Sequence, residues 1–251
     1  MSTAVTPPVE GGPGLSEPQR ILNVYTSPST TFNDIRRNAS WWGPWILFAI
    51  FSLLYVSAVD KKITWDRVTE TALQNMSESQ KARLEQAPPD AQAQQRKIMT
   101  ASFKYISYSF PIVILIATAI MAAVLMAVFN FGFGTEIPFK QAFAVVMYGS
   151  LPRLVTSALA IIIVLLMSNP ENFNFENPVP TNPAVLVDSI AHPGLYRLLV
   201  SFDVVAIWTC IVLGIGFAVV SAGKVKRNTA IGTLLGLYFL WNFAAAGLKS
   251  L

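Results

Sequence analysis

The chain has 251 residues, of which 53% are hydrophobic and only 13% charged, and its formal net charge is +4. So few charges exclude an ordinary soluble domain, which spreads charged residues over every element. A single cysteine and a single histidine also exclude an internal disulfide and a Cys/His metal cluster.

The N-terminal residues 1–16 are rich in proline and glycine and lack an apolar core. This composition predicts a disordered tail. Ser16 is followed by Gln19 at the spacing of a capping box, which predicts that a helix begins at residue 17. We assign residues 17–251 to one membrane domain.

The next segment is apolar on one side and cationic on the other. Phe32 and Ile35 share one helical face, and two arginines follow them directly. This pattern predicts a helical segment in the membrane interface, ahead of an aromatic belt. The predicted interface anchors are Arg36, Arg37, Trp41 and Trp42.

Five apolar stretches are each long enough to cross a bilayer. The shortest is 41–59, and at about 1.5 Å per residue it reaches about 28 Å, close to the thickness of the hydrocarbon core. We therefore predict an all-α polytopic membrane protein with five transmembrane helices. The predicted spans are 41–59, 106–130, 138–167, 197–222 and 229–248.

The largest polar loop, residues 60–104, separates the first two spans. Apolar residues recur in it at helical spacing, and Ser77 with Gln80 opens a second short helix that stops before Pro88. The loop therefore predicts an extramembrane helical hairpin.

Away from their ends, the spans contain only two charged residues, Arg153 and Asp203. A charge in a span costs about 3 kcal/mol, so we expect these two side chains to face each other. Pro152 precedes the arginine and predicts a kink. Such a pair fits either a polar site or gate, or a contact that fixes how two spans dock.

Small residues recur every four positions in the last two spans. Residues at this spacing allow helices to approach closely, with the partner helix in the same chain or in another copy. The predicted packing residues are Gly214, Ala218, Ala222, Gly232 and Gly236.

The short link between the last two spans sets the predicted orientation. It contains Lys224, Lys226 and Arg227, and short basic loops remain cytoplasmic. Counting back over five spans places the N-terminus in the cytoplasm and the C-terminus outside. We expect an integral protein of a bacterial cytoplasmic membrane.

The motifs of intramembrane enzymes are missing. The sequence has no H-E-x-x-H, no phosphate-binding loop, and only one aspartate within a span. We therefore expect no enzyme activity and no catalytic, cofactor-binding or metal-binding residues. The lysines and arginines are scattered at helix ends, so nucleic acid is not an expected partner.

Several short motifs occur in a recognisable order: LNVYTSPSTTFNDI, WWGP, YGSLPRL, and FDVVAIWTCIVLGIG before a short basic link and a last span. In this order the chain resembles bacterial members of the Yip-domain family, five-span proteins named for eukaryotic relatives that interact with Rab/Ypt GTPases. The resemblance implies five helices, a cytoplasmic N-terminus and no enzyme activity. The Asp-Leu-Tyr-Gly-Pro type signature of the eukaryotic branch is not found.

The leading functional hypothesis is a non-enzymatic membrane protein that binds or organises other membrane components. The N-terminal segment and the 60–104 loop are the expected contact surfaces, and the expected partners are the lipid bilayer and a membrane protein or a second copy. One alternative is a small solute or ion transporter or channel that uses Arg153 and Asp203. Another is an accessory subunit of a larger membrane complex.

Overall fold

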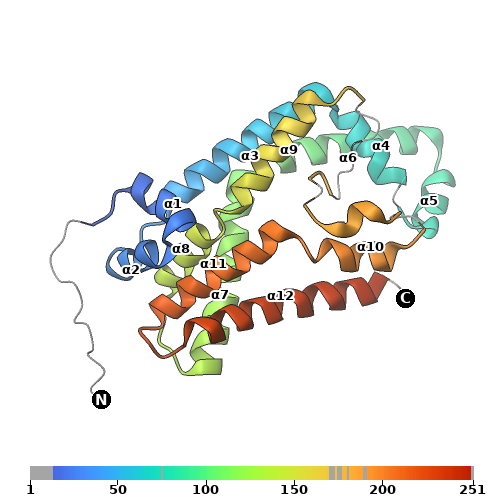
Figure 1. The fold of residues 1–251 in the computed structure, drawn as a ribbon. Helices are drawn as coiled ribbons and strands as arrows, with labels where there is room; N and C mark the ends of the chain where they lie inside the picture. Colours follow the sequence, from blue (N-terminus) through green and yellow to red (C-terminus); the bar gives the residue numbers. More distant parts are fainter. Residues whose placement is uncertain are drawn as a thin grey trace, which may run out of the picture.

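The computed structural model describes most of the chain, and its described residues form α-helices, a short 3-10 helix and no strand (Figure 1). The predicted all-α class is therefore confirmed for this part. Residues 1–16 were predicted to be a disordered tail, and all but the last three of them lie outside the description. The described residues are 14–249 without 75, 170–172, 174–176, 180 and 189–190.

The N-terminal segment forms two short helices, α1 (Glu17–Thr26) and α2 (Pro28–Arg37). The predicted capping box is present, with the Ser16 backbone N–H donating to Gln19 Oε1 at 2.9 Å. Pro28 lies in the first turn of α2, where a proline costs no intrahelical hydrogen bond.

Two helices are long and apolar enough to cross a membrane unbroken. The first is α3 (Trp42–Lys62) and the second is α7 (Phe110–Phe133), which correspond to the first two predicted spans. α7 ends at Gly134, whose φ of 64° is the left-handed conformation that glycine adopts freely.

The third and fourth predicted spans are each broken into two helices. α8 (Phe139–Gly149) and α9 (Arg153–Leu166) meet at a bend of 41°, at the break that contains Pro152. α10 (Pro193–Val200) and α11 (Val204–Val220) meet at a bend of 48°. The second break was not predicted, because no proline marks it.

The fifth predicted span is a helix, α12 (Arg227–Lys249), antiparallel to α11. α12 is not among the helices that qualify as spans by length and composition. The described residues therefore contain two candidate spans, or up to four if each bent pair crosses once. The integral membrane class stands, whereas the number of five spans remains a prediction.

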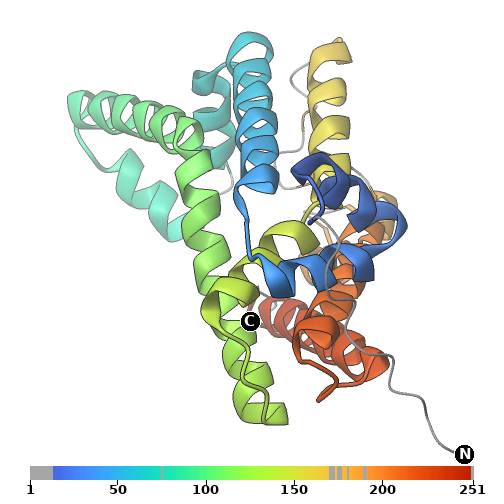
Figure 2. The same ribbon diagram turned by 90° about the vertical axis from the view of Figure 1, so that its left-hand side faces the viewer.

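The polar loop contains α4 (Trp65–Gln74), α5 (Glu78–Glu85) and α6 (Pro89–Tyr108). α4 and α5 correspond to the two short helices predicted in this loop, but α4 is bonded to α6, which was not predicted: the hydroxyls of Thr69 and Thr100 share a hydrogen bond of 2.9 Å. α6 continues to the start of α7. The opposite end of α6 extends away from α3 and α7 (Figure 2).

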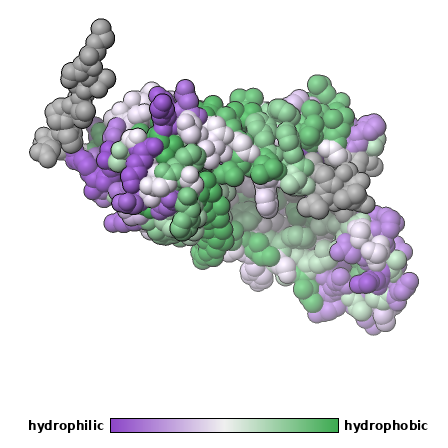
Figure 3. All heavy atoms as spheres, turned by 90° about the horizontal axis from the view of Figure 1, so that it is seen from below, coloured by the Kyte–Doolittle hydropathy of each residue, from purple (hydrophilic) through white to green (hydrophobic). Residues whose placement is uncertain are grey.

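Polar surface gathers at two opposite ends of the molecule, with hydrophobic surface between them (Figure 3). At one end, Lys224 Nζ donates to the Gly134 carbonyl oxygen at 3.1 Å, so the two short links lie together. At the same end, Gln141 Nε2 donates to the backbone oxygen of Arg36 at 3.3 Å. The N-terminal helices and both links therefore share one end of the molecule, and the side of the membrane on which this end lies stays a prediction.

Glycines of α11 set how closely its neighbours approach. A Cβ on Gly214 would lie 2.6 Å from the Cα of Ile231 in α12, so the two backbones touch there. By contrast, Gly232 and Gly236 have nothing within 4 Å of such a Cβ, and both face away from α11. Ala222 lies beyond the end of α11, in a turn with a φ of 54°, and does not contribute to helix packing there.

Two glycine-to-alanine substitutions should therefore change stability in opposite directions. Gly214→Ala forces a methyl group against the α12 backbone and should cost about 1–3 kcal/mol. Gly236→Ala adds a methyl group in open space and should gain up to about 1 kcal/mol of helix propensity. Thermal unfolding in detergent measures both. Equal losses from the two substitutions would show that the Gly236 face is also packed.

Candidate functional site

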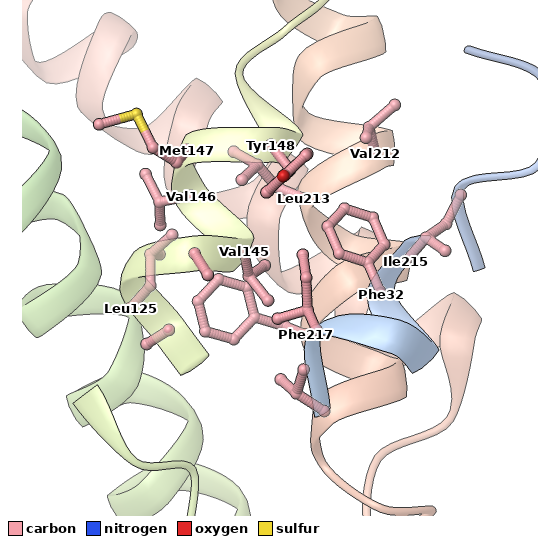
Figure 4. Close-up of a cluster of buried hydrophobic side chains, with 14 of the residues drawn as sticks. Phe32, Leu125, Val145, Val146, Met147, Tyr148, Val212, Leu213, Ile215 and Phe217 are labelled. Carbon is pink, nitrogen blue, oxygen red and sulfur yellow. The ribbon is translucent and has the colours of Figure 1, made fainter. Parts of the chain in front are cut away.

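The two N-terminal helices dock onto the spans through an apolar side. Phe32 of α2 points between α8 and α11, next to Val145 and Phe217 (Figure 4). Phe32 and Ile35 are both 0% exposed. Space for the ring comes from Gly216, because a Cβ there would lie 3.0 Å from Phe32. α8 and α11 therefore cover this apolar side, whereas the position of the segment in the membrane interface stays a prediction.

A buried ion pair joins α1 to α2. The Arg20 guanidinium donates to Asp34 Oδ2 through Nε at 2.7 Å and lies 2.6 Å from the same oxygen through Nη2. Arg20 is 2% exposed and Asp34 is 7% exposed. Arg37 lies on the other side of the carboxylate, with its Nη2 3.9 Å from Asp34 Oδ1, and its side chain is half exposed.

Glu17 links this pair to the spans. One of its carboxylate oxygens accepts a hydrogen bond from Ser40 at 2.6 Å and lies 3.4 Å from Arg20 Nη1. The other oxygen accepts a hydrogen bond from the Tyr148 hydroxyl, near the end of α8. Gly43 provides the space, because a Cβ there would lie 2.4 Å from Glu17 Oε2. We call Glu17, Arg20, Asp34, Ser40 and Tyr148 the polar cluster.

Two further hydrogen bonds tie the N-terminal helices down. The Thr31 hydroxyl donates to the Arg20 carbonyl oxygen at 2.8 Å. The Tyr25 hydroxyl donates to the carbonyl oxygen of Leu151 at 2.8 Å, inside the break between α8 and α9. Burial raises the pKa of Tyr25, so the phenol remains a donor at neutral pH.

The polar cluster keeps Arg20 charged despite its burial. Burial alone would lower the pKa of the guanidinium, but the hydrogen bond and the charge of Asp34 raise it above its ordinary value. A guanidinium and carboxylates paired in this way fix the relative position of several helices. The charged and polar groups of the cluster bond to one another, so the arrangement has a structural role in holding the helices together.

The predicted partners Arg153 and Asp203 do not form an ion pair among the described residues. Asp203 is instead the N-cap of α11, where Oδ1 accepts from the Ala206 backbone N–H at 2.8 Å, and its other oxygen accepts from the Thr181 hydroxyl. Arg153 is exposed at the first position of α9. Both charges are within electrostatic range of Tyr238, so the structure brings them into one neighbourhood without direct contact.

The predicted interface anchors lie at the end of α2 and at the start of α3. Trp41 turns inward, with its ring centroid 5.3 Å from that of Phe143 in an edge-to-face contact. Trp42 is 51% exposed. Arg36 and Arg37 are exposed as well, so cations and an indole lie on the outer surface of this end.

Sequence reasoning missed the polar cluster, although part of its signal is local. Glu17 and Arg20 are spaced three residues apart, as are Asp34 and Arg37, which is the spacing of helical ion pairs. The contact between Glu17 and Tyr148 joins residues 131 positions apart. No local pattern could indicate it.

Comparison with known proteins gives one finding. A family model described as the Yip1 domain matches residues 22–246, which is most of the chain. The search of curated proteins found no match, and neither did the search of solved structures.

Two arginines that contact the same carboxylate provide a matched test of the polar cluster. Arg20→Leu leaves the buried Asp34 without its main counter-charge and should cost about 3–5 kcal/mol. Arg37→Leu removes a half-exposed cation from the same carboxylate and should cost about 1 kcal/mol or less. Unfolding free energies in detergent measure the difference. Similar losses for both variants would contradict the assignment of Arg20 as the residue that holds the cluster.

Proposed function

The chain belongs to the Yip1 domain family, and we propose that it is a non-enzymatic integral membrane protein that binds or organises other membrane components. The observation that carries this proposal is the docked pair of N-terminal helices. A buried ion pair joins the two helices to each other, and the buried ring of Phe32 holds them on α8 and α11. A chain that holds a polar surface so firmly presents a defined platform to a partner.

The outer surface of the platform has the properties of a contact site. Leu22 of α1 is 66% exposed, and the side chain of Arg37 is half exposed. An exposed leucine and exposed cations on the same pair of helices suit a partner with apolar and acidic groups. We propose that this partner is a membrane protein, a second copy of the chain, or a complex in which the chain is an accessory subunit.

The transporter alternative rests on Arg153 and Asp203. The carboxylate of Asp203 accepts hydrogen bonds from the first turn of α11 and from the Thr181 hydroxyl, and both contacts are structural. This engagement favours the organising function over a solute path through the pair.

We also propose the orientation. The end that carries the N-terminal helices carries Lys224, Lys226 and Arg227 in a short link, and short basic links remain cytoplasmic. The N-terminus would then lie in the cytoplasm and the C-terminus outside, with the protein in a bacterial cytoplasmic membrane.

Cysteine labelling tests the orientation. In a Cys210→Ala background, Gln94→Cys in α6 should react with a membrane-impermeant maleimide in intact cells. Lys226→Cys should react only after the cells are made permeable, because its link faces the cytoplasm. The reverse pattern would invert the topology.

Purification from the native membrane in mild detergent, followed by mass spectrometry, tests the partner. We expect a stoichiometric partner that Leu22→Glu removes, since a charge at the contact must be desolvated. Leu186→Glu is the control, because Leu186 is 84% exposed outside the N-terminal helices. No partner, or a partner that both variants retain, would reject the platform as the contact site. Flux assays on Arg153 and Asp203 variants would then follow.

A further inference from the structure

A groove opens among three helices in the hydrophobic part of the molecule. α3 forms its floor and packs against both α7 and α9, which form its walls. Figure 2 shows α3 between these two helices. The hydrogen bond from Trp45 Nε1 to the Pro111 carbonyl oxygen, at 3.0 Å, holds α3 against the start of α7. The groove lies between two candidate spans and half of a bent one.

The lining of the groove follows regular helical faces. Phe48, Phe51, Ser52 and Tyr55 recur at spacings of three and four residues along α3. Across from them, Thr156, Ser157 and Ala160 form one face of α9, and Phe110 with Ile114 closes the side of α7. The surface is therefore aromatic and aliphatic, with a few hydroxyl groups.

The size of the groove limits what can occupy it. Its volume is about 270 Å³. One turn of a partner helix, about 10 Å wide and 5.4 Å long, occupies about 400 Å³ and is too thick to enter. Sites for drug-sized molecules typically have about 300–1,000 Å³. A segment of a single hydrocarbon chain, which is thinner than a helix, matches a narrow apolar groove of this volume.

The hydroxyl groups of the groove are of two kinds. Ser52 donates to the Ala49 carbonyl oxygen at 2.9 Å, and Ser157 donates to the Arg153 carbonyl oxygen at 3.1 Å. Within the described part of the chain, the hydroxyls of Tyr55 and Thr156 have no hydrogen-bond partner. Because lipid chains offer no acceptor, two unpaired donors in an apolar groove favour an occupant that carries one.

We propose that this groove binds one acyl chain of an ester-linked membrane lipid, whose ester carbonyl accepts hydrogen bonds from Tyr55 and Thr156. The acyl chain lies along the aromatic floor that α3 forms, and the two hydroxyl groups hold the ester end of the lipid. A bound lipid of this kind differs from the lipids around the protein, which exchange freely. The site does not depend on the partner of the N-terminal platform.

Photolabelling in nanodiscs tests chain binding. The protein is placed in phosphatidylethanolamine and phosphatidylglycerol with a trace of diacyl lipid that carries a diazirine in one chain. Labelling should concentrate on groove peptides rather than on exposed α7 residues such as Ile120, which is 62% exposed. Uniform labelling of all exposed faces would overturn the proposal, because it would mean surrounding lipid only.

Two substitutions on the same helix serve as a matched pair. Ser157→Trp fills the groove and should reduce groove labelling about tenfold. Leu159→Trp places the same ring on an exposed part of α9 outside the groove and should leave labelling unchanged. Unchanged labelling in Ser157→Trp would overturn the proposal. Melting temperatures verify folding, and Ser157→Leu replaces a tryptophan variant that does not fold.

The role of the hydroxyls has its own test. Native mass spectrometry should find the ester-linked lipid retained in preference to an ether-linked lipid with the same chains, which lacks the carbonyl oxygen. The double variant Tyr55→Phe with Thr156→Val should lose this preference and still bind the chain. Equal retention of both lipids by the unmodified protein would contradict the hydrogen-bonded ester.

Discussion

The position of the N-terminal helices depends on the buried guanidinium of Arg20. A buried arginine is tolerated only where its charge is neutralised and its donors are paired. Asp34 supplies the main counter-charge from the neighbouring helix, and Glu17 adds a second carboxylate that also contacts a span. Since each of these groups is costly to bury alone, α1, α2 and the end of α8 are stable together and unfavourable apart.

The cost of burying a charge without a partner also explains the break between α10 and α11. A carboxylate inside a continuous transmembrane helix would have every nearby backbone N–H already bonded to a carbonyl. At the end of a helix the first N–H groups are free, and Asp203 accepts one of them from Ala206. The interruption between α10 and α11 thus gives the charge a partner. In α8 and α9, by contrast, the interruption follows from the proline.

Much of the helix content could be predicted from the sequence, because apolar stretches and capping signals are local. The capping box at Ser16 and the break at Pro152 are examples. Asp203 was interpreted as a charge within a span, although an aspartate also predicts a helix start. The direction in which Gly232 and Gly236 face could not be predicted, because helical periodicity shows which residues share a face but not which neighbour that face contacts.

The polar cluster was beyond sequence reasoning for a different reason. Its most important contacts join α1 to α2 and to α8, so they exist only once the helices have docked. Phe32 shows the same limit. Its amphipathic pattern fits a membrane surface and a protein groove equally well, and only the space that Gly216 leaves for the ring decides between them.

The hydrogen bond from Tyr25 to Leu151 gives the bend in the third predicted span a mechanical connection. The acceptor is a carbonyl within the interruption itself, and the donor belongs to a helix at the cytoplasmic end in the proposed topology. A displacement of α1 would therefore be transmitted directly to the break between α8 and α9. A protein bound to α1 would act, through this single hydrogen bond, on the angle between the two halves of the bent pair.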